Sequence, residues 1–129
     1  MNMRDNLNDK IILIKKEKTM EELELIKGDT LVFDFEIEGL KQDLESCFFS
    51  CKKDKTSSEY AFQKSLNNGI TKIDTTENSR IYQVKISPED TRNMKAGYYY
   101  YDIQIKVGDD VFTPLLNQLK IIEDITKEE

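Results

Sequence analysis

The sequence predicts a single all-β domain in which antiparallel strands pack as a β-sandwich. Two observations lead to this prediction. Apolar and polar residues alternate along several segments, and Gly, Asn and Asp residues fall between those segments. Alternation places apolar side chains on one face of a strand and polar side chains on the other, as half-buried antiparallel strands require. The chain has 129 residues, the usual size of one domain, and a domain of this size has enough core to fold without metal or disulfides.

Four segments alternate most clearly, namely 30–37, 45–52, 80–87 and 98–107. In each of them the apolar side chains occupy one alternate set of positions, which predicts the face turned to the core. The predicted core residues are Phe33, Phe35, Phe49, Tyr82, Val84, Tyr101, Ile103 and Ile105. Apolar content and bordering turn residues predict further strands at 22–26, 60–66 and 111–122.

Turn residues separate these strands, with Gly28, Gly39, Gly69 and Gly108 at or beside the predicted turns. Gly, Asn and Asp accept the left-handed backbone of tight turns. The spacing of the turns is typical of a sandwich or a barrel.

One helical turn interrupts the pattern. Ser87 is a favourable N-cap, Pro88 suits the first helical position, and two acids follow. We therefore expect a helical turn or two over 88–95, ended by Gly97. Pro114 lacks an amide N–H, so we expect it at an edge or bulge of the last strand.

Together these elements predict an immunoglobulin-like antiparallel β-sandwich of about seven to eight strands at 21–126, with one short helical turn before the penultimate strand. Residues 127–129 are then a charged tail.

The first twenty residues have two interpretations. Ile11, Ile12, Leu13 and Ile14 form an apolar run without alternation, and such a run needs cover on both faces. We predict that residues 1–20 are an arm whose apolar run binds a neighbouring subunit, by strand addition or in a groove. The alternative is that 10–16 is the first strand of this domain, since such edge strands are common.

Charge and hydropathy restrict the partners and the compartment. The formal net charge is −6, which disfavours nucleic acid and anionic membranes as partners. The apolar run is far shorter than a signal peptide or a membrane helix requires. We expect a protein that is made and kept in the cytoplasm unless an assembly carries it out.

The two cysteines, Cys47 and Cys51, lie four positions apart on one predicted strand. At about 3.3 Å per residue they are roughly 13 Å apart, too far for a disulfide. A metal site would need a closer pair and more ligands. We predict two reduced, buried thiols that contribute only packing.

The sequence offers little equipment for catalysis. It has no histidine, the commonest general base and a frequent metal ligand. The glycines are scattered singly, so no phosphate-binding loop is present. Glu36 with Glu38, or Glu89 with Asp90, could form a carboxylate pair, but neither lies beside a recognisable cleft. We predict no enzyme, no cofactor and no metal.

A hairpin tip offers one alternative metal site. Asp109 and Asp110 could contribute oxygen ligands to calcium. Two aspartates in a turn are more simply turn residues.

The run from Tyr98 to Tyr101 also has two interpretations. Tyr98 and Tyr100 on the outer face could form a platform that stacks on sugars or bases, or could contact a protein. The structural interpretation is that Tyr99 and Tyr101 face the core and the outer pair fill cross-strand positions, where aromatic residues are favoured.

Several segments resemble a known family. The segments ISPEDT at 86–91, KAG at 95–97 and YYYYDIQ at 98–104 resemble small immunoglobulin-like proteins encoded among the structural genes of tailed bacteriophages and prophages of Gram-positive bacteria. Segments 26–33, 62–70 and 119–126 are similar to other parts of that family, so the resemblance covers about 22–126. The segment LKQDL at 40–44 departs from the family, because it lacks the usual Thr-Gly pair, and the first twenty residues have no counterpart.

The resemblance implies a non-enzymatic virion structural protein, made in the host cytoplasm and present in many copies. We expect an accessory or decoration protein bound to the capsid, with the major capsid protein as partner. A tail, neck or baseplate adaptor is the alternative. A carbohydrate-binding β-sandwich that uses Tyr98 and Tyr100 is a third possibility.

Overall fold

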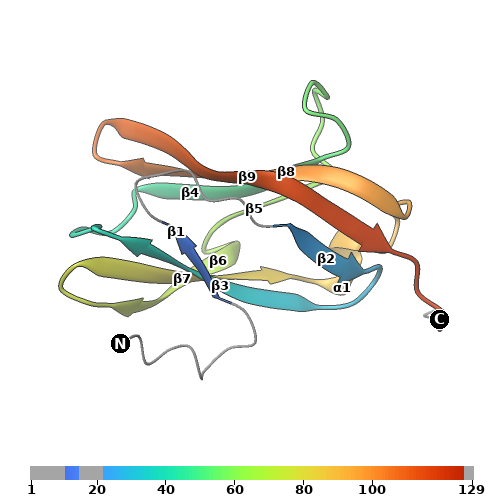
Figure 1. Ribbon diagram of the computed structural model, residues 1–129, viewed down its shortest axis with the longest axis horizontal. Coiled ribbons are helices and arrows are strands. Elements are labelled where there is room, and N and C mark those ends of the chain that lie inside the picture. The colour runs from blue at the N-terminus through green and yellow to red at the C-terminus, as the bar shows by residue number, and fades with distance from the viewer. Residues whose placement is uncertain (1–10, 15–21, 127–129) are drawn as a thin grey trace.

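The computed structural model describes residues 11–14 and 22–126, which form nine strands and one short helix (Figure 1). The strands are β1 (Ile11–Ile14), β2 (Leu23–Ile26), β3 (Leu31–Glu38), β4 (Ser46–Lys52), β5 (Phe62–Leu66), β6 (Gly69–Thr75), β7 (Ser79–Ile86), β8 (Gly97–Val107) and β9 (Asp110–Ile122), with α1 (Pro88–Thr91) between β7 and β8. The all-β prediction is confirmed. The arm predicted at 1–20 and the tail at 127–129 lie outside the described residues, apart from β1.

Hydrogen bonding joins the nine described strands into one sheet in the order β1-β3-β7-β6-β5-β4-β8-β9-β2. The sheet curls on itself, so that β3 and β7 form one layer and β4, β8 and β9 the other (Figure 1). The sequence predicts two sheets of about seven to eight strands in total. The two layers are instead continuous, because β5 pairs with β4 and, over two residues, with β6.

The core lies between the two layers and follows the predicted alternation. All eight predicted core residues are buried. Phe49 of β4 stands at its centre, with its ring 5.8 Å from that of Phe33, 5.9 Å from that of Phe62 and 5.1 Å from that of Tyr101. Aromatic pairs in these geometries add to the stabilisation from apolar burial, so β3, β4, β5 and β8 are held by one aromatic cluster.

Two acids on β3 depart from the predicted pattern. Alternation predicts that Asp34 and Glu36 face water, but both are buried. β3 is an interior strand with a neighbour on each side, and polar groups on β7 supply partners. Ser79 Oγ donates to Glu36 Oε2 at 3.0 Å, and Gln83 Nε2 donates to Asp34 Oδ1 at 3.3 Å. The hydrogen bonds offset the cost of burying these carboxylates.

The helix α1 occupies the predicted place but ends at Thr91, earlier than the predicted residue 95. The amide of Ser87 donates to Asp90 Oδ2 at 2.7 Å, which fixes the first turn. Asp90 also forms an ion pair with Lys64 of β5 at 2.7 Å, and Thr91 Oγ1 accepts from the amide of Gly28 at 2.9 Å. α1 is thereby tied to both β5 and the turn before β3.

Two local features concern β6 and β9. The sequence prediction missed β6, because only Ile70 among its seven residues is buried and no alternation marks it. Pro114 was expected at an edge or a bulge, and its backbone lies in the register shift of β9 against β8, between Phe112 and Leu115. A bulge is one of the few places in a sheet where proline, which has no amide N–H, is tolerated.

Cys47 and Cys51 are both buried free thiols, as predicted. Burial raises the pKa of each thiol to about 12, so almost no thiolate forms at neutral pH. We expect both thiols in the native protein to react with a thiol reagent far more slowly than in denatured protein, with no disulfide in the intact mass. Rapid reaction of native protein, or a mass two hydrogens lower, would contradict this assignment.

Candidate binding groove

An open groove of about 540 Å³ lies on the outer face of the layer that contains β4, β5, β8 and β9. The loop at 53–61 joins β4 to β5 and projects from this layer, at the upper right of Figure 1. The groove is lined by Phe48, Ser50, Lys52, Lys55, Tyr60, Gln63, Tyr100, Tyr101, Asp102, Gln104 and Leu116. Apart from the loop residues, these side chains stand on strands and are therefore held in a rigid arrangement.

Strand register sets the order of side chains along the groove. On β8, the even-numbered positions from Tyr100 to Gln104 face outward. Antiparallel pairing places Lys52 of β4 beside Tyr100, and Ser50 beside Asp102. The groove therefore has a tyrosine and lysine end, followed by a carboxylate and then by amide and apolar groups.

In the run from Tyr98 to Tyr101, alternate tyrosines face the core, as the structural interpretation predicts. Tyr99 and Tyr101 are 5% and 1% exposed, whereas Tyr98 is 47% exposed. Tyr99 donates from its hydroxyl to the Lys95 carbonyl at 2.8 Å. Tyr100 lines the groove, and Tyr98 stands on the same face one pair further along, opposite Lys120 of β9. Their roles in binding remain predictions.

A lysine lies over each of three tyrosine rings at this face. Lys52 Nζ is 5.2 Å from the ring centre of Tyr60, and Lys55 Nζ is 5.1 Å from that of Tyr100. Lys120 Nζ is 5.6 Å from the ring centre of Tyr98. These distances fit cation–π attraction. These lysines were not among the residues predicted from the sequence, although the alternation of 45–52 places Lys52 on the outer face.

The middle of the groove is polar. Asp102 is partly buried, and this burial raises the pKa of its carboxyl group, while the charge of Lys52 opposes the rise. Gln63 Nε2 donates to Ser50 Oγ at 2.9 Å. A ligand in the groove would therefore meet a carboxylate acceptor and side-chain amides close to the lysines.

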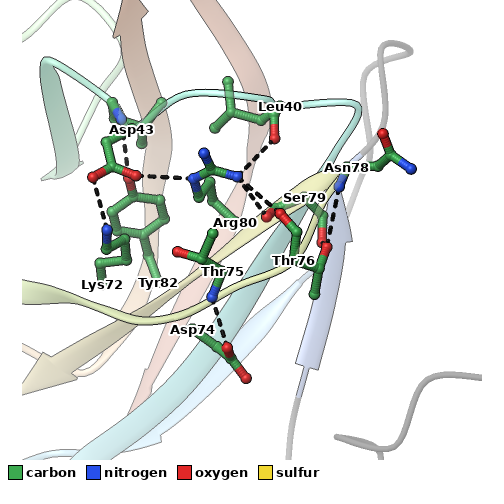
Figure 2. Close-up of polar contacts among 11 residues, drawn as sticks. Leu40, Asp43, Lys72, Asp74, Thr75, Thr76, Asn78, Ser79, Arg80 and Tyr82 are labelled. Atoms are coloured by element: carbon green, nitrogen blue, oxygen red, sulfur yellow. Dashed lines mark hydrogen bonds and ion pairs between the residues drawn. The ribbon is translucent and has the colours of Figure 1, made fainter.

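A second polar cluster fixes the loop between β3 and β4 (Figure 2). Arg80 of β7 donates from Nε to Asp43 Oδ1 at 2.9 Å and from Nη1 to three carbonyl oxygens at 3.1–3.2 Å. Lys72 Nζ lies 2.7 Å from Asp43 Oδ2, and the hydroxyl of Tyr82 accepts from the amide of Leu44 at 3.0 Å. Because these groups satisfy one another, the cluster has a structural role.

The remaining sequence candidates lie elsewhere. Ile11–Ile14 pairs in parallel with β3, from Ile11 beside Asp34 to Ile14 beside Ile37, so these four residues form a strand of the domain's own sheet. β1 pairs with β3 in one layer, whereas the groove lies on the outer face of the other layer, so the structure does not bring the run together with Tyr98 and Tyr100. Within residues 11–14 and 22–126, no helix is long and apolar enough to cross a membrane, and no three His, Cys, Asp or Glu side chains cluster as metal ligands.

No protein-family model matches the chain, and no curated protein matches it in sequence. Solved structures with a similar fold include a family 123 glycoside hydrolase from Clostridium perfringens, at 11% identity and a TM-score of 0.49 over 81% of this chain. The chain spans only 23% of that hydrolase.

Two other similar structures are single small domains. PbICP-C, solved in complex with falcipain-2, has 11% identity and a TM-score of 0.49 over 89% of this chain and 99% of its own. The N-terminal domain of phage TP901-1 ORF48 has 12% identity and a TM-score of 0.40 over 89% of this chain and 98% of its own.

Proposed function

We propose that the chain is a non-enzymatic structural protein of a bacteriophage virion, which attaches to another virion protein through the groove. The observation that carries the binding role is the groove itself, where Lys52 and Tyr100 of the sheet meet Lys55 and Tyr60 of the loop at 53–61. Tyrosine is enriched at protein interfaces, because it combines apolar area with a polar group. The partner in this proposal is the major capsid protein, which the chain decorates in many copies. A tail, neck or baseplate protein is the alternative partner.

The assignment to a virion is supported by the resemblance of residues 22–126 to phage structural proteins. Under this assignment, the fold is a variant of the immunoglobulin-like sandwich. The strand orders β1-β3-β7-β6 and β4-β8-β9 support this, because they correspond to the two sheets of that sandwich. Further support comes from Tyr99 near the start of β8, whose hydroxyl bonds the backbone four residues upstream, like the tyrosine corner of such domains.

Sedimentation with virions tests this proposal. We expect the tagged chain to co-sediment with purified virions of the phage that encodes it, and gold-labelled antibody to decorate the capsid in micrographs. Label on the tail or baseplate would favour the alternative partner. A chain that stays in the supernatant and is missing from the virion proteins would refute the proposal.

A carbohydrate-binding role is the second candidate. Tyr60 and Tyr100 flank a groove that also contains Gln63, Asp102 and Gln104, and sugar sites combine aromatic rings with such polar groups. Screening the isolated chain against cell-surface glycans of the host tests this role. Binding of a neutral glycan that is lost in Y100A would favour it over protein attachment.

A further inference from the structure

The outer face described above carries three lysines that form no salt bridge in the described part of the chain, although the charge of Lys52 acts on the Asp102 carboxyl group. Lys52, Lys55 and Lys120 form no ion pair within the described part of the chain, although Asp54 and Glu59 lie on the same loop as Lys55. Four of the eight other lysines in the described chain form ion pairs with carboxylates. Lys27, Lys64, Lys72 and Lys106 lie 3.0, 2.7, 2.7 and 3.8 Å from Glu123, Asp90, Asp43 and Glu45, respectively.

The tyrosines hold these lysines in place. Each ammonium lies over the ring of Tyr60, Tyr100 or Tyr98 at 5.1–5.6 Å. A lysine side chain has several rotatable bonds, and holding it over a ring reduces the entropy lost when it binds an anion. A sugar could not stack on a ring face that an ammonium already covers. The arrangement therefore favours an anionic ligand over a neutral sugar.

The rest of the groove distinguishes between anionic ligands. Asp102 lies beside Ser50 and two positions from Tyr100, and Phe48 and Leu116 add apolar surface. A polyanionic glycan has the same charge along its length and would meet the Asp102 carboxylate unfavourably. A peptide can place an acidic side chain at the lysines, offer a backbone N–H to Asp102 and cover the apolar residues. The stretch from Tyr98 to Gln104 is about 20 Å long, which suits an extended segment of about six residues.

We propose that the face formed by Lys52, Lys55, Lys120 and their three tyrosines binds an extended acidic segment of a partner protein, with Tyr60, Tyr98 and Tyr100 as positioning residues for the lysines. This proposal rests on the proposed function, because it names the chemistry of the segment that the virion partner supplies. The net charge of the chain is −6. Because this charge repels acidic peptides in general, binding depends on these lysines.

Peptide binding to the full-length chain tests the proposal. The probe is a fluorescent peptide of alternating Glu and Leu, and its affinity is measured by anisotropy at low and high salt. We expect saturable binding that weakens with salt, and much weaker binding of the peptide in which Gln replaces Glu. Equal binding of both peptides would overturn the proposal. So would binding of polygalacturonate, an anionic polysaccharide, in place of the Glu peptide.

Matched lysine variants locate the site. We expect K52Q/K55Q/K120Q to bind the Glu peptide about tenfold more weakly, since three surface charge contacts together are worth about one decade in affinity. The control K41Q/K85Q/K95Q removes the same charge at exposed positions outside the groove and should change affinity by less than about twofold. Equal losses in both variants would show that net charge, and not this face, governs binding.

The tyrosines are tested by a conservative pair. Y100F keeps the ring and should bind the peptide like the unaltered chain, whereas Y100L removes the cation–π contact and should weaken binding about threefold. Loss in Y100F would instead assign the role to the hydroxyl and contradict the positioning role.

Virion sedimentation separates the two proposals. If the chain and K52Q/K55Q/K120Q co-sediment equally with virions, the acidic-segment proposal fails and the virion function stands. If the chain binds the Glu peptide but never sediments with virions, the virion function fails and the acidic-segment proposal stands.

Discussion

Replacing Phe35 with alanine is expected to lower the free energy of unfolding by about 3–5 kcal/mol. Phe35 is fully buried on β3, and its ring stacks on that of Tyr82 at 5.7 Å. The substitution removes the apolar area of the ring and leaves a cavity that the curled sheet cannot easily close. Since small domains have a total stability of about 5–15 kcal/mol, urea denaturation should show a large shift of the midpoint.

Val32 on the same strand provides the control. It is 39% exposed on the outer face, so V32A should cost less than about 1 kcal/mol. Both variants shorten a side chain of β3 to alanine. F35A does so on the buried face and V32A on the outer face. An unchanged melting temperature in F35A, or equal losses in both variants, would show that the alternation of β3 does not define the core.

Much of the fold could be predicted because alternation reports burial directly. The patterns at 45–52 and 98–107 place Cys47, Phe49, Tyr101 and Ile103 on one face, and these residues are buried. Alternation could not identify β6, whose side chains are mostly exposed, or the burial of Asp34 and Glu36. Burial of those acids depends on partners from β7, which are far away in the sequence.

Less of the groove could be predicted. The outward direction of Tyr98 and Tyr100 follows from the period of the strand, but the lysines over their rings do not. Lys55 and Tyr100 are 45 positions apart in the sequence, and they meet because β4 pairs with β8 and the following loop turns over the sheet. A sequence pattern therefore shows the aromatic residues and not the charges that accompany them.

Replacing Arg80 with methionine is expected to cost about 3 kcal/mol of stability, although methionine fills a similar volume. The Arg80 side chain is 11% exposed and donates to the carbonyl oxygens of Leu40, Thr76 and Ser79, in addition to Asp43 (Figure 2). Methionine leaves the carbonyl oxygens of Leu40 and Thr76 without this donor, whereas the Ser79 carbonyl still accepts from the Thr76 amide at 3.0 Å. The loop between β3 and β4 loses its attachment to β7. Urea denaturation with fluorescence or circular dichroism measures the loss.

Lys72→Met is the matched control, since Lys72 contacts the same carboxylate but is 39% exposed. Its cost should be a small fraction of that of Arg80→Met, because exposed ion pairs contribute little. Similar losses would place the stabilisation in the Asp43 charge and not in the carbonyl contacts of Arg80.

The pH dependence of stability separates the charge of Asp43 from those carbonyl contacts. Hydrogen bonds from Lys72 and Arg80 lower the pKa of Asp43 below its ordinary value of 3.8. A carboxyl group whose pKa is lowered on folding stabilises the protein above that ordinary value, and the contribution is lost as the pH falls toward the folded-state pKa. We therefore expect unaltered protein to lose stability between about pH 5 and pH 3 more steeply than Arg80→Met. The carbonyl contacts carry no titrating group, so most of the cost of Arg80→Met should persist at the acid end of this range, where the contribution of the Asp43 charge is lost. If that cost disappears at the acid end and the two pH profiles then coincide, the carbonyl contacts contribute nothing, and the network acts through the Asp43 charge alone.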